Sequence, residues 1–320
     1  MPPLAIVKPA ASAAWKLLVR TAVLTPLFWL PVEEKIRIER RLRGREQWQK
    51  LVAADVVIVS FGKSGRTWLR VMISRFYGYR HGFSEQALVG FDNFHLRDRR
   101  VPKIFFTHDN YLKDYTGNAD SKVDYYDKKV VLLVRHPADV AVSQYHQWKY
   151  RMRPRKKVIN AYPEGDVDLF TFVARHEAGL AKVIDWMNGW ARELPRLQDC
   201  LVVRFEDMKA DTAGTLARIL AFMGTPGTPE EIAEAVRFGS FENMRAMEAQ
   251  NRFWLSGGRM RAADRSNPAS YKTRRGEAGG WRKDFTPEQV AEIEAIVERR
   301  LMKGFGYLAV EQLPPVAPAA

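Results

Sequence analysis

Residues 60–68 place two glycines, a lysine and two hydroxyl side chains in one short stretch, Ser-Phe-Gly-Lys-Ser-Gly-Arg-Thr-Trp. The glycines allow a tight turn whose backbone N–H groups can approach an anion. Lys63 supplies a mobile positive charge, and Ser64 and Thr67 supply hydroxyl donors. The apolar run 55–59 before the turn indicates a buried parallel strand, and the segment after it indicates a helix whose positive end adds to the same spot. The stretch therefore predicts a P-loop-like phosphate-binding turn between a strand and a helix.

The spacing of this turn differs from that of a nucleoside-triphosphate loop. In that loop a glycine, four residues and a second glycine come before Lys-Ser or Lys-Thr. Here Lys63 comes before Gly65, and no glycine stands five residues before Gly62. An ordinary glycine-containing turn with a solvated lysine is the alternative to a phosphate site, so other segments have to decide.

A second segment supports the phosphate interpretation. The buried-strand pattern 129–135 ends at Arg135, which offers a bidentate donor at the edge where open α/β sheets bind ligands. Pro137 ends the strand, and Asp139 can cap the helix that follows. Ser143 lies one turn into that helix, where its hydroxyl can join Arg135 on one anion. A third segment, 271–283, crowds basic residues around glycines and predicts a mobile flap over another phosphate.

These three segments, in this order, resemble the PAPS-dependent sulfotransferases of the cytosolic-type domain family, and we expect a bacterial source. PAPS, 3′-phosphoadenosine-5′-phosphosulfate, is the sulfuryl donor. Residues 60–68 resemble the 5′-phosphosulfate loop of the family, and the Arg135–Ser143 segment resembles its 3′-phosphate motif. Residues 204–208 resemble its Tyr-Glu-Asp segment, and residues 274–281 resemble its Arg-Lys-Gly flap. The likeness runs from about residue 55 to about residue 286.

The resemblance implies an α/β fold, a three-layer α/β/α sandwich with a central parallel sheet, and transfer of a sulfuryl group to a hydroxyl or amine. It implies that His108 is the base. His108 closes a buried run, so it would stand at the carboxyl edge of the sheet beside the phosphate turn, where a neutral imidazole can take the proton of the acceptor. Trp68 and Phe205 would sandwich adenine. The implied donor site comprises Lys63, Ser64, Gly65, Arg66, Thr67, Trp68, Arg135, Ser143, Phe205, Arg274, Arg275 and Gly276.

Four positions depart from the family pattern. Gly62 replaces a proline, Arg66 replaces a threonine and Phe205 replaces a tyrosine. The lysine that the family commonly places near the transferring group is replaced by Phe106. Lys63, which we expect to place charge on the bridging oxygen, or Arg66 would then carry more of that charge.

The rest of the chain fits one large domain over residues 51–308. Short apolar runs at 103–106 and 201–204 predict further strands, and residues 170–194 show helical periodicity. Capping-box patterns predict helix starts at Thr228 and Thr286. The last helix has apolar residues at Val290, Ile293, Val297 and Leu301, and we expect it to stop at Gly304. The Pro/Ala-rich end, within 309–320, predicts a disordered tail.

Composition limits the partners. The formal net charge of +14 suits nucleic acid, but the sequence has no nucleic-acid recognition motif, so we expect a polyanionic cofactor and an acidic or membrane-bound acceptor instead. The single cysteine, Cys200, excludes an intramolecular disulfide and is expected to be a buried core thiol. No grouping of His, Cys, Asp or Glu has metal-ligand spacing, and we predict no metal. We expect a cytoplasmic protein.

Residues 1–50 form an apolar and basic extension. Aromatic and aliphatic residues in 13–30 lie beside the arginine-rich stretch 33–45. This pattern suits an interfacial helix on an anionic membrane, with a lipid or glycan acceptor, and it equally suits a helix packed on the domain itself. The basic run 149–157 is either a solvated stretch or the rim of the acceptor cleft.

Two other function classes stay open at this point. One is a P-loop kinase-like phosphoryl transferase, although the required Walker lysine and Mg²⁺ ligands are missing. The other is a non-catalytic, membrane-peripheral protein that binds an adenine nucleotide, and Phe106 in place of a lysine makes this conceivable. The small-molecule, lipid or glycan acceptor of the sulfotransferase hypothesis is not specified by the sequence.

Overall fold

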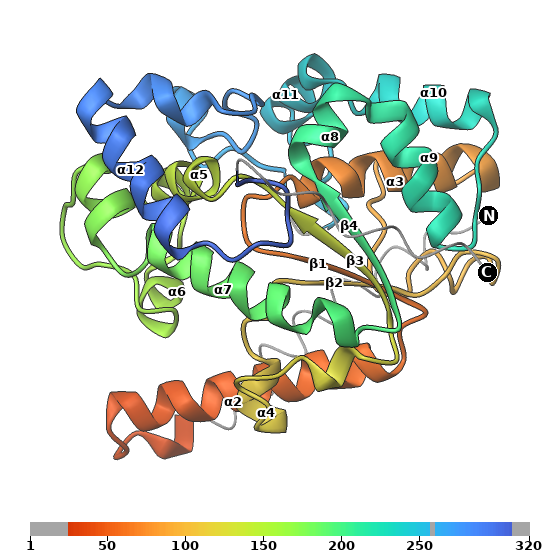
Figure 1. Cartoon of the computed structure of the whole chain (residues 1–320). Coiled ribbons are helices and arrows are strands. Elements are labelled where there is room, and N and C mark those ends of the chain that lie inside the picture. Colours follow the sequence, from red (N-terminus) through yellow and green to blue (C-terminus); the bar gives the residue numbers. More distant parts are fainter. Residues whose placement is uncertain (1–24, 257–259, 309–320) are drawn as a thin grey trace.

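Four parallel strands form the central sheet. The computed structural model describes residues 25–256 and 260–308 (Figure 1). Its strands are β1 (Val56–Ser60), β2 (Ile104–Thr107), β3 (Lys129–Val134) and β4 (Asp199–Arg204), in the order β2-β1-β3-β4. Each neighbouring pair is parallel, so the carboxyl ends of all four strands meet at one edge.

The apolar strands separate two hydrophobic cores because alternate side chains point to opposite faces. Val57 and Val59 of β1 enter one core, and Val56 and Ile58 enter the other. On the first face lie α5 (Pro137–Tyr150), α7 (Leu180–Glu193) and α12 (Pro287–Arg300). On the second face lie α3 (Arg66–His81), α9 (Thr212–Phe222) and α10 (Pro229–Phe238). The sheet with helices on both faces confirms the predicted α/β/α sandwich.

The remaining helices surround the carboxyl edge and the lower end of the sheet in Figure 1. They are α2 (Val32–Val52), α4 (Leu112–Thr116), α6 (Pro154–Ile159), α8 (Phe205–Ala210) and α11 (Phe241–Ala249). Short 3-10 turns are η1 (Thr25–Leu27), η2 (Val123–Tyr125), η4 (Leu194–Arg196), η5 (Trp254–Ser256), η6 (Pro268–Ser270) and η7 (Gly280–Asp284). The helix α2 lies along α4. Within the described part of the expected N-terminal extension, the helix α2 therefore packs against the domain.

Two helix boundaries follow the expected capping chemistry, and two differ from expectation. Thr228 and Thr286 both form complete capping boxes at the starts of α10 and α12. The helix α12 ends at Arg300, before the expected stop at Gly304. The helical pattern 170–194 is broken into a π-helical turn, η3 (Thr171–Arg175), and α7. Gly179 lies at that break, where an added Cβ would be 2.1 Å from the carbonyl oxygen of Phe172.

Other expectations concern the chain ends and the single thiol. Residues 1–24 and 309–320 lie outside the described residues, and these include residues 13–24 of the apolar N-terminal stretch and the expected disordered tail. In the part of the chain that is described, no helix is both long and apolar enough to cross a bilayer. Cys200 lies in β4, partly buried against the core, and burial raises the pKa of its thiol to about 12.

Candidate functional site

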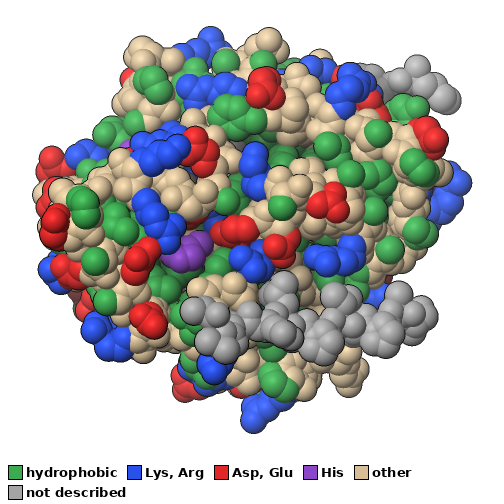
Figure 2. Space-filling view, turned by 45° about the horizontal axis from the view of Figure 1, so that its top comes forward, with side chains coloured by type: hydrophobic (Ala, Val, Ile, Leu, Met, Phe, Trp, Pro, Cys, Tyr) green, Lys and Arg blue, Asp and Glu red, His purple; other side chains and the backbone are tan. Residues whose placement is uncertain are grey.

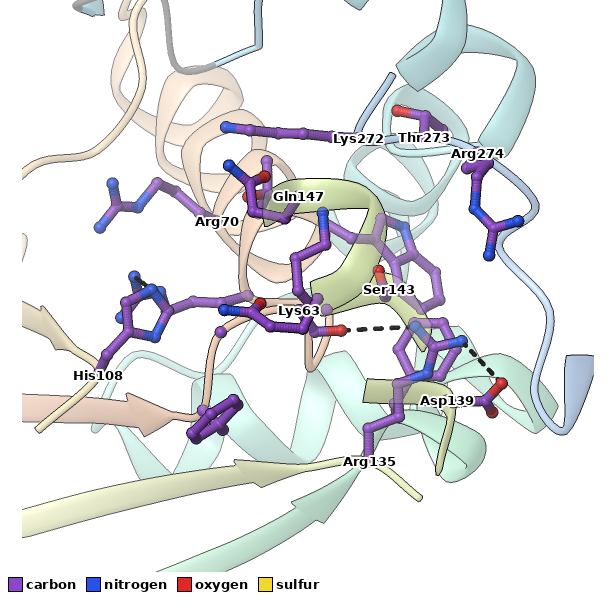
Figure 3. Close-up of a pocket in the computed structure, with 18 of the residues that line it drawn as sticks. Lys63, Arg70, His108, Arg135, Asp139, Ser143, Gln147, Lys272, Thr273 and Arg274 are labelled. Atoms are coloured by element: carbon purple, nitrogen blue, oxygen red, sulfur yellow. Dashed lines mark hydrogen bonds and ion pairs between the residues drawn. The ribbon is translucent and has the colours of Figure 1, made fainter. Parts of the chain in front are cut away.

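A cavity of about 1090 Å³ opens at the carboxyl edge of the sheet. Its wall comes from the turn after β1, the residues after β2, the start of α5 and the predicted flap. Figure 3 shows Lys63 near the middle of this space, with His108 on one side and Arg135 and Arg274 on the other. The predicted chemical residues, far apart in sequence, therefore meet at one place.

The turn after β1 presents its backbone to the cavity. Lys63 and Gly65 have φ values of 78° and 93°, so the chain folds tightly before α3 begins at Arg66. Such alternating backbone conformations form a concave set of N–H groups that binds anions, and the helix start adds positive potential. Thr67 lines the cavity, whereas Ser64 is 1% exposed and does not appear among the lining residues. The Ser64 side chain thus lies beneath the turn in this structure.

Lys63 lies in a strongly cationic environment. Burial lowers the pKa of its ammonium to about 7, and the neighbouring charges of Lys272 and Arg151 lower the pKa further than Glu248 raises it. Figure 3 shows Lys272 and Arg70 on the same side of the cavity. The neighbouring positive charges disfavour protonation of Lys63. A ligand with several negative charges would offset this repulsion, so the cluster is suited to such a ligand.

His108 follows β2 and is fixed in one tautomer. Its Nδ1 donates to the carbonyl oxygen of Ser60 at 2.7 Å, so Nε2 is the acceptor of the neutral ring. A guanidinium N–H of Arg66 donates to that Nε2 at 2.5 Å. Burial, followed by the charge of Arg66, lowers the pKa of His108 well below its usual value. The ring is therefore an uncharged base whose lone pair is held by Arg66.

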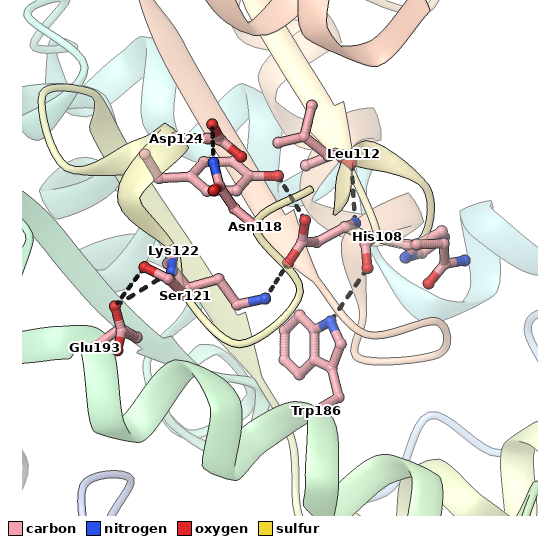
Figure 4. Close-up of polar contacts among 12 residues, drawn as sticks. His108, Leu112, Asn118, Ser121, Lys122, Asp124, Trp186 and Glu193 are labelled. Atoms are coloured by element: carbon pink, nitrogen blue, oxygen red, sulfur yellow. Dashed lines mark hydrogen bonds and ion pairs between the residues drawn. The ribbon is translucent and has the colours of Figure 1, made fainter. Parts of the chain in front are cut away.

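Three hydrogen bonds hold the backbone around His108 (Figure 4). The indole of Trp186 donates to the carbonyl oxygen of His108 at 3.1 Å. The next residue, Asp109, has φ 55° and accepts from Lys122 at 2.7 Å and from Tyr125 at 2.8 Å. These contacts stabilise an unusual backbone position and keep the imidazole at the edge of the cavity.

Arg135 connects the phosphate turn with the flap. Its guanidinium donates to the carbonyl oxygen of Lys63 at 3.4 Å and to that of Glu277 at 2.6 Å. It also lies 4.3 Å from the ring centroid of Phe205. Ser143 of α5 lines the same part of the cavity. The structure thus brings Arg135 and Ser143 together as the sequence predicts.

The flap is attached to α5 through Asp139. This carboxylate accepts from the backbone N–H groups of Gly279 at 2.7 Å and of Trp281 at 3.1 Å. The predicted capping of its own helix is therefore wrong: the N-cap is His136, without a side-chain bond. The loop between β3 and α5 is also held in place, since Glu206 accepts from the backbone N–H of His136 at 2.9 Å.

The two arginines of the flap, Arg274 and Arg275, differ in their partners. Arg275 forms a bidentate pair with Asp284, at 2.8 and 2.6 Å. Arg274 faces Arg135 across the cavity in Figure 3, and burial followed by the charge of Arg275 lowers its pKa. Gly276, with φ 65°, lies on the ring of Phe241. Among the described residues Arg274 has no ion-pair partner and can meet an anion in the cavity, whereas Arg275 already has a carboxylate partner.

The predicted adenine sandwich is not compatible with the ring positions. The rings of Trp68 and Phe205 contact each other edge to face, with centroids 5.8 Å apart at 66°, so no third ring fits between them. Phe205 is buried under Gly65, where an added Cβ would lie 2.6 Å from its ring. Sequence reasoning missed Phe241, an aromatic that lines the cavity against the flap. No spacing in the sequence connects Phe241 to the phosphate turn, because only the fold brings them together.

Arg70 is a second residue that sequence reasoning missed. Its guanidinium lies 3.8 Å from the ring centroid of Phe106, and both residues line the cavity. Arg70 is one helical turn after Arg66 on α3, which could have signalled that both face the same side. The buried guanidinium of Arg70 thus lies against Phe106, the position at which the resemblance described above leads one to expect a lysine.

Acidic groups are few in this cavity. Among the described residues that line it, the carboxylates are Asp139 and Glu277, and Glu277 pairs with Lys283 at 2.8 Å. Within the described ranges, no three His, Cys, Asp or Glu side chains come together in a way that could hold a metal. On the outer face in Figure 2, by contrast, Lys and Arg are spread with Asp and Glu between them. The lining of the cavity therefore carries many more cations than carboxylates.

A model of the family described as "Sulfotransferase domain" matches residues 53–306. The chain therefore belongs to the sulfotransferase domain family. This membership confirms the predicted enzyme class and PAPS as its donor, and it displaces the kinase-like alternative. The flap, the phosphate turn and His108 all lie within the matched range.

Among curated relatives, human sulfotransferase 2A1 is 24% identical over 259 residues, which cover 77% of this chain and 84% of the relative. Rat sulfotransferase 2A6 is 27% identical over 297 residues, covering 88% of this chain and 93% of the relative. Cytosolic sulfotransferase 15 of Arabidopsis thaliana is 25% identical over a match that covers 86% of this chain and 78% of the relative. These organisms give no support to the expected bacterial source.

Solved structures share the fold. Mouse sulfotransferase SULT7A1, complexed with PAP, is similar with a TM-score of 0.50 and 22% identity, over 80% of this chain and 89% of that one. Retinol dehydratase, in a complex with retinol and PAP, has a TM-score of 0.54 and 19% identity, over 82% and 83%. At these identities the likeness concerns the α/β/α architecture.

Proposed function

We propose that this chain moves a sulfuryl group from PAPS to a hydroxyl, or an amine, of an acceptor, with His108 as the base. The observation that carries the proposal is the neutral imidazole beside the phosphate turn, with its Nδ1 hydrogen committed to Ser60. In the transfer, a bond forms between the acceptor oxygen and sulfur, and the bond from sulfur to the bridging phosphate oxygen breaks. The acceptor proton goes to Nε2, and the electron pair of the broken bond stays on the phosphate of PAP, 3′-phosphoadenosine-5′-phosphate.

The donor is proposed to span the turn and the flap. The N–H groups of residues 63–67, with Lys63 and Thr67, would hold the 5′-phosphosulfate. Arg135, Ser143 and Arg274 would hold the 3′-phosphate, with Arg275 contributing only if it leaves Asp284. Adenine would lie against Trp68 and Phe241 at the outer end of the cavity. This arrangement places two separated cationic groups against the two anionic parts of the ligand, and aromatic rings against its adenine.

Catalysis requires a change at Arg66. In this structure its guanidinium occupies the Nε2 lone pair that must receive the proton. We propose that the sulfuryl oxygens attract Arg66 away from His108 as the donor binds, since charge-assisted bonds to an anion are stronger than a bond to a neutral ring. Arg66 would then stabilise the transferring group, and Lys63 the leaving oxygen.

We propose a catalytic domain over residues 51–308 and a cytoplasmic protein that touches anionic membranes weakly through its N-terminus. Phe28 and Trp29 are 79% and 63% exposed beside the start of α2. Arg37, Arg41 and Arg45, all exposed, follow at intervals of four on that helix. Exposed aromatic rings beside a cationic stripe are typical of an interfacial contact.

Thermal unfolding tests the donor assignment directly. PAP should raise the melting temperature in the absence of metal, and the shift should grow with its concentration. ATP with Mg²⁺ is the comparison, and it should give a smaller shift at equal concentration. Stabilisation by ATP with Mg²⁺ but not by PAP would contradict the proposed function.

A further inference from the structure

Gln144 carries an unsatisfied polar atom next to the base. The side chain is 7% exposed, its Nε2 donates to the hydroxyl of Tyr162, and its Oε1 is buried with no hydrogen-bond partner among the described residues. A Cβ placed on Gly62 would lie 3.4 Å from this Oε1 and 3.9 Å from Cε1 of His108. The amide and the imidazole therefore flank one spot, and a ligand hydroxyl there would satisfy the buried oxygen.

The wall beyond Gln144 is polar and continuous. Tyr162 takes the Gln144 amide on its hydroxyl, and the ammonium of Lys182 lies 4.8 Å from the centroid of the Tyr162 ring. Lys182 also donates to the carbonyl oxygen of Asn160 at 2.5 Å. The amide of Asn160 accepts from the hydroxyl of Tyr111 at 3.2 Å. All five residues line the cavity, so one wall offers amides, phenols and an ammonium group.

Lys182 brings charge that its surroundings do not neutralise. No carboxylate of the described residues lies within ion-pair distance of its ammonium, whose bonded partner is the carbonyl oxygen of Asn160. Burial lowers the pKa of Lys182, and the charges of Arg40 and Lys113 add to that effect against Glu177. A partly buried lysine without a counter-ion is costly unless a ligand supplies the negative charge. The proposed donor phosphates lie at the other end of the cavity, with Arg135 and Arg274.

We propose that the acceptor is a polyhydroxylated anion. One of its hydroxyls lies between His108 and Gln144, and its acidic group pairs with Lys182 across Tyr162. This inference rests on the proposed function, and it extends that function by naming the chemistry of the acceptor. A sugar with a carboxylate and a lipid headgroup with hydroxyls and a phosphate share this chemistry. An apolar alcohol would leave both the Gln144 oxygen and the Lys182 charge without a partner.

Pairs of probes that differ mainly in charge test whether the site recognises the acidic group of the acceptor. The protein is saturated with PAP, and equilibrium binding is measured for 4-nitrophenyl β-D-glucuronide and 4-nitrophenyl β-D-glucoside, which differ in the carboxylate. A second arm compares short-chain phosphatidylglycerol with phosphatidylcholine. We expect at least one anionic probe to bind about tenfold more tightly than its neutral partner, as one charged contact would give. The arm that shows the preference identifies the source.

Variants then assign the preference to Lys182. Lys182→Met should remove most of the tenfold preference, and Lys182→Arg should keep it. Lys303→Met is the matched control, since this exposed residue lies outside the cavity wall and its loss changes the net charge equally. Gln144→Leu should weaken both members of a pair alike, because it removes the hydroxyl contact and leaves the charge. Stabilisation by PAP shows that each variant is folded.

The outcomes separate the two proposals. Equal binding of anionic and neutral probes, no binding of either anionic probe up to roughly 10 mM, or an unchanged preference in Lys182→Met would overturn the inference, while stabilisation by PAP leaves the proposed function standing. A wild-type protein that PAP does not stabilise would contradict the proposed function itself, and the acceptor inference with it.

Discussion

Arg66 donates to Nε2 of His108 at 2.5 Å, on the side of the ring opposite the Nδ1 bond to Ser60. Both ring nitrogens are therefore engaged before any substrate arrives. Together with burial, which is the larger cause, the contact keeps the imidazole neutral, because a nearby guanidinium disfavours a second positive charge. It also keeps the base unavailable until Arg66 has a better partner. In the proposed mechanism, this pair of side chains links donor binding to the readiness of the base.

Removing the charge of Arg66 should raise the pKa of His108. Burial is the larger cause of its low pKa and Arg66 is the second, so Arg66→Met should move the pKa part of the way toward its usual value. A base is lost when it is protonated, so the acidic limb of the turnover profile should move to higher pH. Turnover over a pH range, together with NMR titration of the His108 ring, measures the shift. Arg66→Lys keeps the charge and should move the limb less; an identical limb in all three proteins would contradict this account.

Loss of the His108 imidazole should lower turnover and leave donor binding nearly unchanged. His108→Ala should lower turnover by about a hundredfold or more, as for other positioned bases. The affinity for PAP should change little, because the ring faces the acceptor. His95→Ala is a suitable control, since that histidine bonds to Val101 outside the cavity. If His108→Ala turns over nearly normally and keeps the same acidic limb, the base lies elsewhere.

Donor binding should take up a proton near neutral pH. Burial and Lys272 lower the pKa of Lys63 to about 7 in the free protein. A bound polyanion raises that pKa, so at about pH 8 the complex holds a proton that the free protein lacks, and affinity falls as pH rises above 7. Titration calorimetry with PAP in buffers of different ionisation enthalpy measures the uptake. Lys63→Met should abolish it and weaken binding, and buffer-independent heats in the wild type would refute the assignment.

Arg135 should account for recognition of the 3′-phosphate. Arg135→Ala should lower the preference for PAP over adenosine 5′-phosphate by about tenfold or more, because a charge-assisted bond is lost. Arg275→Ala should lower it much less, since Asp284 already holds that guanidinium. Competition binding with the two nucleotides gives both numbers. A preference that survives in Arg135→Ala would place the 3′-phosphate elsewhere.

Membrane contact should depend on two exposed rings. Deleting the first 45 residues would also remove Arg43 from the cavity wall, so point changes are the sharper test. Phe28→Ser with Trp29→Ser should reduce pelleting with anionic vesicles, because those rings would enter the interface. Trp254→Ser is the matched control, as Trp254 is 62% exposed on another element. Equal pelleting of the double variant and the wild type would exclude this contact.

Local patterns predicted the parts of the site that lie within short stretches. The strand before Ser60, the turn through Gly65 and the helix after it are adjacent in sequence, and alternation and glycine spacing specify them. The pattern could not show that Arg275 pairs with Asp284 while its neighbour Arg274 stays in the cavity. It also could not place Phe241, which reaches the flap only through the packing of α11. Long-range packing decides which of several similar residues faces the ligand.

The ring of Phe205 lies between the two proposed anion-binding regions, the turn at Gly65 and the guanidinium of Arg135. Its edge fills the space that a side chain on Gly65 would occupy, and the guanidinium of Arg135 lies 4.3 Å from its centroid. A rigid aromatic spacer of this kind fixes how far apart the two sites can be. We therefore expect selection among nucleotides to follow the separation between their phosphates more closely than their total negative charge. Coenzyme-like molecules with the same charge but a different phosphate spacing would then be poor competitors.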